Sequence, residues 1–229
     1  MRWFVLLAVV TSGMNAHLAA APQQSGASSS ASAEILPPDI DPESRNRLPR
    51  VQREDLDDRG KELFDSIVSD GRRLGLAGPS GIRMHSPRVS EYMSMGNLYL
   101  RFEAGIEPRL MELAILTVAR EMNSQFEWSA HEPAGLRVGL EQSIIDVVKH
   151  RRPLAGLGEQ EAAIIQLGRE AFGRHRVEPE TFARALRLFG RQELVNIVSL
   201  MGHYAATAIL LTTFDQQLRP GQEPMLPVP

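Results

Sequence analysis

The sequence predicts an all-α protein. Aromatic residues make up only 6% of the 229 residues, and valine, isoleucine and threonine do not gather in alternating runs, although a β-rich fold favours both. Apolar residues instead recur at helical spacing, as in the stripe formed by Leu56, Leu63, Phe64, Ile67 and Val68. The hydrophobic content of 43% and charged content of 23% suit one globular core rather than several.

The first 21 residues have the pattern of a secretory signal peptide. Arg2 precedes a short apolar run, Trp3–Val10, and small residues ending in Ala19-Ala20-Ala21 follow it. The run is too short to cross a bilayer, which takes about 20 apolar residues, so we expect no stable membrane span. The sequence therefore predicts a secreted or periplasmic protein. An uncleaved N-terminal anchor is the alternative.

Residues 22–50 are rich in serine, alanine and proline, a composition that buries too little apolar surface to offset the entropy lost on ordering. They are predicted to form a disordered linker that docks through Ile35, Leu36 and Leu48 near its end. Residues 51–218 form the predicted helical domain. The tail, residues 219–229, contains four prolines and is predicted to be irregular.

Prolines at first-turn positions and glycines after last turns set the predicted helix boundaries. The stretch 72–84 holds three glycines and Pro79, which favours a loop. The predicted helices cover residues 55–70, 87–103, 108 to a break near 123, from that break to 139, 142–149, 159–172, 179–189 and 192–217. The helices around Leu113 and Leu210 are apolar on more than one face, which predicts a homo-oligomer.

Charge and composition exclude several classes of function. Lys and Arg total 25 against 28 Asp and Glu, and the net charge of -3 disfavours nucleic acid as a partner. The absence of cysteine excludes disulfides, thiolate metal sites and thiol-based peroxidase chemistry. The sequence has no glycine-rich phosphate loop after a strand and no Gly-x-Ser-x-Gly elbow, so no cofactor is predicted.

The candidate catalytic group is His131, Glu127 and Glu112. Glu127 and His131 are four residues apart, which places them on one helical face. A carboxylate beside an imidazole favours its cationic form and so provides a proton donor near neutral pH. Glu112 lies on the preceding predicted helix. Pro133 would kink the same helix and free the carbonyl of Ser129. The alternative is an ordinary ion pair on a solvated helix face.

At this point the residues resemble a known family. The pattern R-x-x-E-L-A-I-L from Arg109, followed by N-S-x-F-E-W-x-x-H ending at His131, is similar to the carboxymuconolactone decarboxylase family, which includes alkylhydroperoxidase D-like proteins. The resemblance covers roughly residues 56–214. It implies a compact all-α fold and a homo-oligomer, a trimer or hexamer, with sites near subunit contacts.

The resemblance also separates two branches of that family. The two cysteines of the thiol branch fall on Ser124 and Glu127, so its disulfide chemistry cannot operate here. The decarboxylase branch carries a glutamate four residues before the histidine, which Glu127 and His131 match.

Further residues are predicted to bind substrate near this group. Arg109 or Arg120 could hold a carboxylate, and Trp128 could provide an apolar wall; structural ion pairing is the alternative for the two arginines. Histidines could also reach the pocket or line its rim, with core or surface roles as alternatives. Helical E-x-x-x-H spacing alone is a poor metal signal, so no metal is predicted. The predicted substrate-binding residues are Arg109, Arg120, Trp128, Ser124, His203 and His85.

The predicted function is therefore an exported, cofactor-independent lyase of the decarboxylase type, or an isomerase. Its substrate is a small carboxylated or lactone molecule, on which His131 protonates carbon or an enolate. Two alternatives stay open. One is a non-catalytic oligomeric binding or scaffold protein, and the other is a peroxiredoxin-like antioxidant protein that has lost its thiols.

Overall fold

The computed structural model describes residues 36–69 and 76–227. These residues form eight α-helices and no β-strand, which confirms the predicted all-α fold. The predicted signal peptide, residues 1–21, and the linker up to Ile35 lie outside the described residues.

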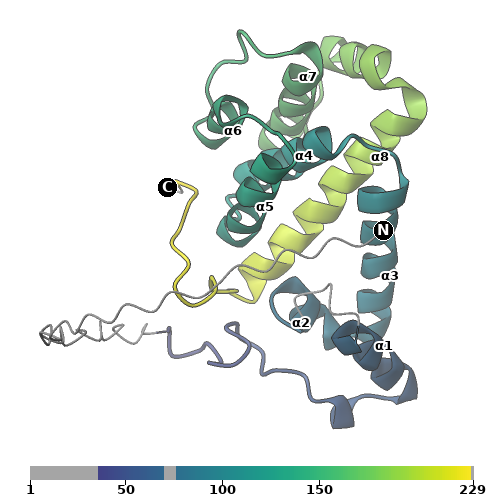
Figure 1. Ribbon diagram of the computed structural model, residues 1–229, viewed down its shortest axis with the longest axis vertical. Helices are drawn as coiled ribbons and strands as arrows, with labels where there is room; N and C mark the ends of the chain where they lie inside the picture. The colour runs from purple at the N-terminus through teal and green to yellow at the C-terminus, as the bar shows by residue number, and fades with distance from the viewer. Residues whose placement is uncertain (1–35, 70–75, 228–229) are drawn as a thin grey trace, which may run out of the picture. The chain divides into compact units, whose positions relative to one another are not determined.

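Figure 1 shows the helices and the order in which they follow one another along the chain. A 3-10 turn at Arg53–Asp55 comes first, and π-helical turns at Tyr99–Glu103 and Arg169–Arg174 extend the third and seventh helices. The α-helices are α1 (Asp58–Ser69), α2 (Pro79–Met84), α3 (Pro87–Leu98), α4 (Pro108–Glu121), α5 (Gln125–Arg137), α6 (Gln142–Lys149), α7 (Glu159–Gly168) and α8 (Pro179–Thr213).

One predicted boundary is wrong and another is confirmed. Helix α2 occupies part of the predicted loop 72–84, because Pro79 starts a helix and Gly81 permits a close contact within it. A Cβ atom at Gly81 would lie 2.3 Å from the carbonyl oxygen of Leu76. The two helices predicted on either side of Gly190 are confirmed, because α8 is interrupted by a kink at that residue, where the backbone is non-helical with φ 67° and ψ -178°.

Helix α4 lies at the centre of the core and packs against α5, α6, α7 and α8 (Figure 1). Every residue from Leu110 to Arg120 is buried, and Leu113 has no exposed surface. The all-round apolar character of this helix is thus satisfied within one chain. A smaller core of Val51, Ile67, Leu76 and Met84 joins α1 and α2.

Helix α8 is the one helix in the described part of the chain that could cross a membrane by its length and composition. However, 56% of its apolar window is buried inside the protein. The core helix of a globular protein has the same composition, since it is apolar on several faces.

The two ends of the described chain are held by hydrogen bonds. Residues 36–50, which the sequence assigns to the linker, dock onto the end of α8. The Asn46 amide donates to the side-chain oxygen of Gln216 at 3.1 Å, and Arg47 donates to the Thr213 carbonyl at 3.0 Å. Ile40 is buried, whereas Leu36 and Leu48 are half-buried. Residues 219–227, the described part of the tail, contain no helix or strand, yet Leu226 is only 3% exposed.

Candidate functional site

The centre of the candidate site is the imidazole of His131, which lies between two carboxylates. Glu127 and His131 share one face of α5, and Glu112 reaches them from α4. Glu112 Oε2 lies 2.6 Å from His131 Nδ1, and Glu127 Oε2 lies 3.5 Å from His131 Nε2. The three side chains are 3% to 10% exposed. The structure therefore brings together the three residues predicted to be catalytic.

Two arginines and a tyrosine complete the group. Arg101, on the π-helical turn after α3, places Nη2 3.1 Å from Glu112 Oε1. Arg83, on α2, donates from Nη2 to Thr207 Oγ1 at 2.6 Å. The ring of Tyr204 on α8 meets the His131 ring edge-to-face, with 5.0 Å between centroids. We call Glu112, Glu127, His131, Arg83, Arg101 and Tyr204 the His131 cluster.

Burial changes the proton affinity of the groups around His131. It raises the pKa of Glu127 above the usual carboxyl value, although the positive charges of His131 and Arg83 partly oppose this. Burial likewise raises the pKa of Tyr204, so its phenol stays protonated. The pKa of His203 falls to about 4, first because of burial and then because of Arg83 and Arg101. His203 is therefore neutral at pH 7.

This geometry defines which atoms can exchange protons. A carboxylate only accepts hydrogen bonds, so the short Glu112 contact puts the proton of a neutral His131 imidazole on Nδ1. Nε2 then presents its lone pair toward Glu127. Because Glu127 has a raised pKa, it can offer a proton in that direction. Proton-donor and proton-acceptor atoms thus lie side by side in the cluster.

The same arrangement does not form a metal site. The two carboxylates contact opposite nitrogens of the His131 ring, so they cannot share one ion with it. Within residues 36–69 and 76–227, no group of three or more histidine, aspartate or glutamate side chains has the geometry to hold a metal.

Two surface hollows are found elsewhere on the protein. One lies along α1 and α3 and includes Glu62 and Met95, and the other lies on α8 and includes Phe182 and Val195. Neither is lined by the His131 cluster. Arg101 has a more exposed side chain than the three residues it adjoins, at 24%, so the π-helical turn forms the outer edge of the cluster.

Three of the predicted substrate-binding residues lie away from His131. Arg109 pairs with Glu161 and Glu107 instead. Arg120 is buried near the end of α4 and donates to Asn123 Oδ1 at 2.8 Å. His85 is exposed, and its Nε2 lies 3.0 Å from the carbonyl oxygen of Pro49.

The other three lie on α8 and on or next to α5. His203 borders the cluster, with its ring centroid 5.7 Å from that of Tyr204. Ser124 immediately precedes α5 and is buried, but its side chain makes no capping hydrogen bond. Trp128 is fully buried and donates from Nε1 to Glu132, on the neighbouring face of α5.

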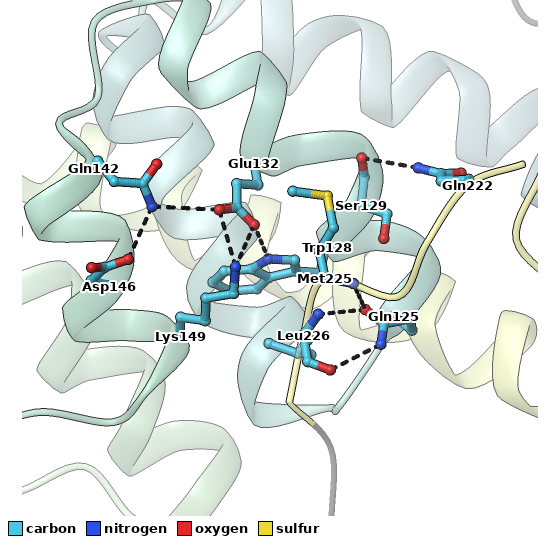
Figure 2. Close-up of polar contacts among 10 residues, drawn as sticks. All are labelled: Gln125, Trp128, Ser129, Glu132, Gln142, Asp146, Lys149, Gln222, Met225 and Leu226. Carbon is cyan, nitrogen blue, oxygen red and sulfur yellow. Dashed lines mark hydrogen bonds and ion pairs between the residues drawn. The ribbon is translucent and has the colours of Figure 1, made fainter.

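That neighbouring face forms a second polar group (Figure 2). Lys149 Nζ lies 3.2 Å and 3.1 Å from the two carboxylate oxygens of Glu132 and sits over the Trp128 ring. The tail packs beside it, where the Gln125 side chain hydrogen-bonds Leu226. We call Trp128, Glu132 and Lys149 the Glu132 cluster.

Sequence reasoning missed four residues at the site: Arg83, Arg101, Tyr204 and Thr207. Arg83 lies in the stretch predicted to be a loop. Arg101 lies on a π-helical turn that no local sequence pattern indicates. Tyr204 directly follows His203. The predicted role of His203 in substrate binding is therefore the sequence feature that could have pointed to Tyr204. π-helical turns inside helices occur frequently at functional sites.

No family model matches the sequence, and no curated protein matches it. The structure is similar to a solved structure from Agrobacterium tumefaciens, that of a protein of unknown function suggested to be the antioxidant defence protein AhpD. The TM-score is 0.55 at 19% sequence identity, and the match covers 60% of this chain and 94% of that chain. At this identity the likeness establishes an AhpD-like fold and nothing about activity.

Proposed function

We propose that this chain, which has an AhpD-like fold, is an enzyme that moves protons with His131 and its two glutamates. The reaction is a cofactor-independent decarboxylation or isomerisation of a small carboxylated or lactone substrate. The observation that carries the proposal is the buried His131 imidazole with a carboxylate at each ring nitrogen, 2.6 Å and 3.5 Å away. Buried groups with perturbed proton affinity cluster at active sites.

Each residue has a defined task in this reaction. When the bond to the departing carboxylate breaks, its electron pair passes to the substrate carbon and spreads into the adjacent carbonyl as an enolate. Glu127 delivers its proton to that carbon, either directly or through His131 Nε2, whose lone pair faces it. Glu112 accepts the Nδ1 hydrogen and orients the ring. Positioned acid–base catalysis of this kind contributes about 10²–10⁴-fold in rate.

The direct test is to assay purified protein against lactones, β-keto acids and enolisable carboxylates. His131→Ala, Glu127→Gln and Glu112→Gln should each remove turnover while circular dichroism and melting temperature show an intact fold. His85→Ala is the matched control, since His85 is exposed and contacts Pro49 rather than the cluster. Unchanged turnover in His131→Ala would reject the proposal.

A binding or scaffold role is the second candidate. It is favoured by the small exposure of the three central side chains and by the position of both surface hollows away from them. In that case the same substitutions would change stability or binding, and no substrate in the screen would be turned over. Antioxidant chemistry by the protein's own thiols is excluded, because the sequence has no cysteine.

We further propose that the protein is a homo-oligomer. Tyr92, Met95 and Phe102 expose apolar side chains along α3 and the turn that extends it, and Val195 and Val198 do so on α8. Exposed apolar surface of this kind is common at subunit contacts. Sedimentation at micromolar concentration should give a trimer or hexamer, and a monomer would contradict it.

We also propose export through the N-terminal segment. The basis is the apolar run Trp3–Val10 and the small residues after it. Mass spectrometry of protein from the native host should find a mature chain that begins near Pro22. An intact Met1 terminus in the cytoplasm would reject export.

A further inference from the structure

Arg83 is unusual among the arginines of the described chain. Only Arg83 and Arg120 are buried there, with 9% and 7% of their surface exposed. Arg120 lies in the last turn of α4, where the helix carbonyls favour a cation, and it donates to Asn123. Arg83 makes one hydrogen bond, to the neutral hydroxyl of Thr207, and no ion pair with any described residue.

A buried cation without a counter-ion is costly, because it has lost its hydration and gained little in return. The carboxyl group that most attracts Arg83 is that of Glu127. However, burial raises the pKa of Glu127 and so favours its neutral form. The other arginine of the cluster, Arg101, is already paired with Glu112. Arg83 is therefore a buried cation without an ion-pair partner among the described residues.

The position of Arg83 is fixed by a two-step hydrogen-bond chain. Thr207 Oγ1 donates to the carbonyl of His203 at 3.0 Å and accepts from Arg83 Nη2 at 2.6 Å. A hydroxyl has one hydrogen to donate, so this pattern fixes the direction of both bonds. The Nε atoms of Arg101 and Arg120 are fully buried and have no hydrogen-bond partner. No nitrogen of Arg83 is fully buried in this way. Arg83 can thus offer N–H donors to a small molecule.

We infer that Arg83 is the anion-binding residue of the site and receives one carboxylate group of the substrate, next to Glu127 and His131. This inference rests on the proposed function for the identity of the substrate, but not for the binding itself. Arg101 is paired with Glu112, whereas Arg83 has no ion-pair partner among the described residues and can therefore take one negative charge. A molecule with a second carboxylate would meet Glu112 and Glu127. Thr207 is a positioning residue, since it acts through Arg83.

Acetate is the probe that tests this inference, because it is the smallest monocarboxylate. The melting temperature of the full-length protein is measured against acetate at constant ionic strength, balanced with chloride. We expect a saturable rise with acetate, none with the neutral analogue acetamide, and a weaker response to the dianion malonate. Linkage between binding and stability converts the rise into an affinity.

Four variants assign the response to Arg83. In Arg83→Met the acetate affinity should fall about tenfold or more, the range of one charge-assisted hydrogen bond. Arg83→Lys should keep part of it. Thr207→Val should weaken it, and Thr207→Ser should restore it. Arg109→Met is the matched control, because Arg109 pairs with Glu161 away from the cluster, and it should bind acetate normally.

The outcomes separate the two proposals. Equal acetate affinity in Arg83→Met and the unchanged protein would overturn the anion site, as would a response to chloride equal to that to acetate. If Arg83→Met does not fold, Thr207→Val decides, and unchanged affinity there overturns the inference. Acetate binding that depends on Arg83, together with full turnover in His131→Ala, would reject the proposed catalysis and keep the anion site.

Discussion

Two acidic side chains on α5 differ in how their charge is satisfied. Glu132 is buried, but both of its oxygens contact Lys149 Nζ, and the indole of Trp128 donates to it as well (Figure 2). Glu127 is equally buried, yet its nearest charged partner is His131 Nε2 at 3.5 Å. The two residues are five positions apart and lie on faces of the helix that differ by roughly 140° about its axis.

The difference separates a structural role from a functional one. A fully paired buried carboxylate holds its surroundings in one arrangement, and breaking it leaves an unpaired charge. A poorly paired one costs stability and is retained where its proton affinity is used. By this criterion Glu132 holds α5 against α6, whereas Glu127 fits the proton-transfer role proposed for it at His131.

The difference between Glu132 and Glu127 can be tested by making the same substitution at both positions. Glu132→Gln should lower the free energy of unfolding by about 3 kcal/mol, because Lys149 loses its buried counter-ion. Glu127→Gln should change it by less than about 1 kcal/mol, since glutamine keeps the shape and removes a group that is costly to bury. Urea denaturation of the two variants measures both values.

Lys149→Met, combined with Glu132→Gln, is the control for this measurement. The double variant should recover much of the lost stability, because no unpaired charge is left. If Glu127→Gln destabilises the protein as much as Glu132→Gln does, the distinction between the two carboxylates fails.

The sequence could predict one of these faces better than the other. Glu127 and His131 stand out through i,i+4 spacing, and Glu112 through the resemblance to a known family. The pairing of Glu132 with Lys149 spans 17 residues, and that of Arg83 with Thr207 spans 124. No local periodicity encodes such contacts, because they depend on how helices pack. Helix α6 was predicted with its observed bounds, since its apolar residues and boundaries are local.

The tail provides a second test of the structural role of the Glu132 side of α5, because it packs beside the Glu132 cluster. Gln125 Oε1 accepts hydrogen bonds from the backbone of Met225 and Leu226, at 3.1 Å and 2.7 Å, and its Nε2 donates to the Leu226 carbonyl at 2.9 Å. Leu226→Ala should cost about 2 kcal/mol, through lost burial of an apolar side chain. Gln125→Ala should cost a similar amount, through unpaired backbone groups.

Thermal denaturation checks these two values, and Met225→Ala serves as the control because Met225 is only partly buried. A loss below about 0.5 kcal/mol in both Leu226→Ala and Gln125→Ala would mean that the tail does not support α5. Turnover on any substrate found should persist, since the tail does not contact Glu127 or His131.

The pH dependence of stability tests the electrostatics on the His131 side. The pKa of His203 is about 4 in the folded protein, against 6.5 when unperturbed, so the unfolded chain takes up a proton first as pH falls. The stability that neutral His203 provides is therefore complete above about pH 6.5 and is lost toward pH 4. His203→Asn should remove up to about one proton from the uptake on unfolding in this window.

Glu127 acts in the opposite sense. Its raised pKa makes its contribution to stability complete below the unperturbed carboxyl pKa of 4.5, and this contribution is lost as pH rises through the folded-state pKa. The comparison must therefore be made between His203→Asn and the unchanged protein at each pH, in urea titrations from pH 7 to pH 5. Parallel pH profiles for the two proteins would show that burial and Arg83 do not suppress the charge of His203.

The smallest expected effect concerns Pro133, which lies inside α5 and cannot donate to the Ser129 carbonyl. That carbonyl instead accepts from the Gln222 side chain of the tail, at 3.3 Å. Pro133→Ala would supply the missing N–H and should stabilise the helix by up to about 1 kcal/mol, if the local backbone relaxes.

Gln222→Ala alone should cost about 0.5 kcal/mol. In the Pro133→Ala background the same Gln222 substitution should cost almost nothing, because the carbonyl has a helical partner. A double-mutant cycle measured by urea denaturation gives this coupling. Strictly additive effects would show that Gln222 does not serve the carbonyl that Pro133 leaves open, and that the tail is held by Leu226 and Gln125 alone.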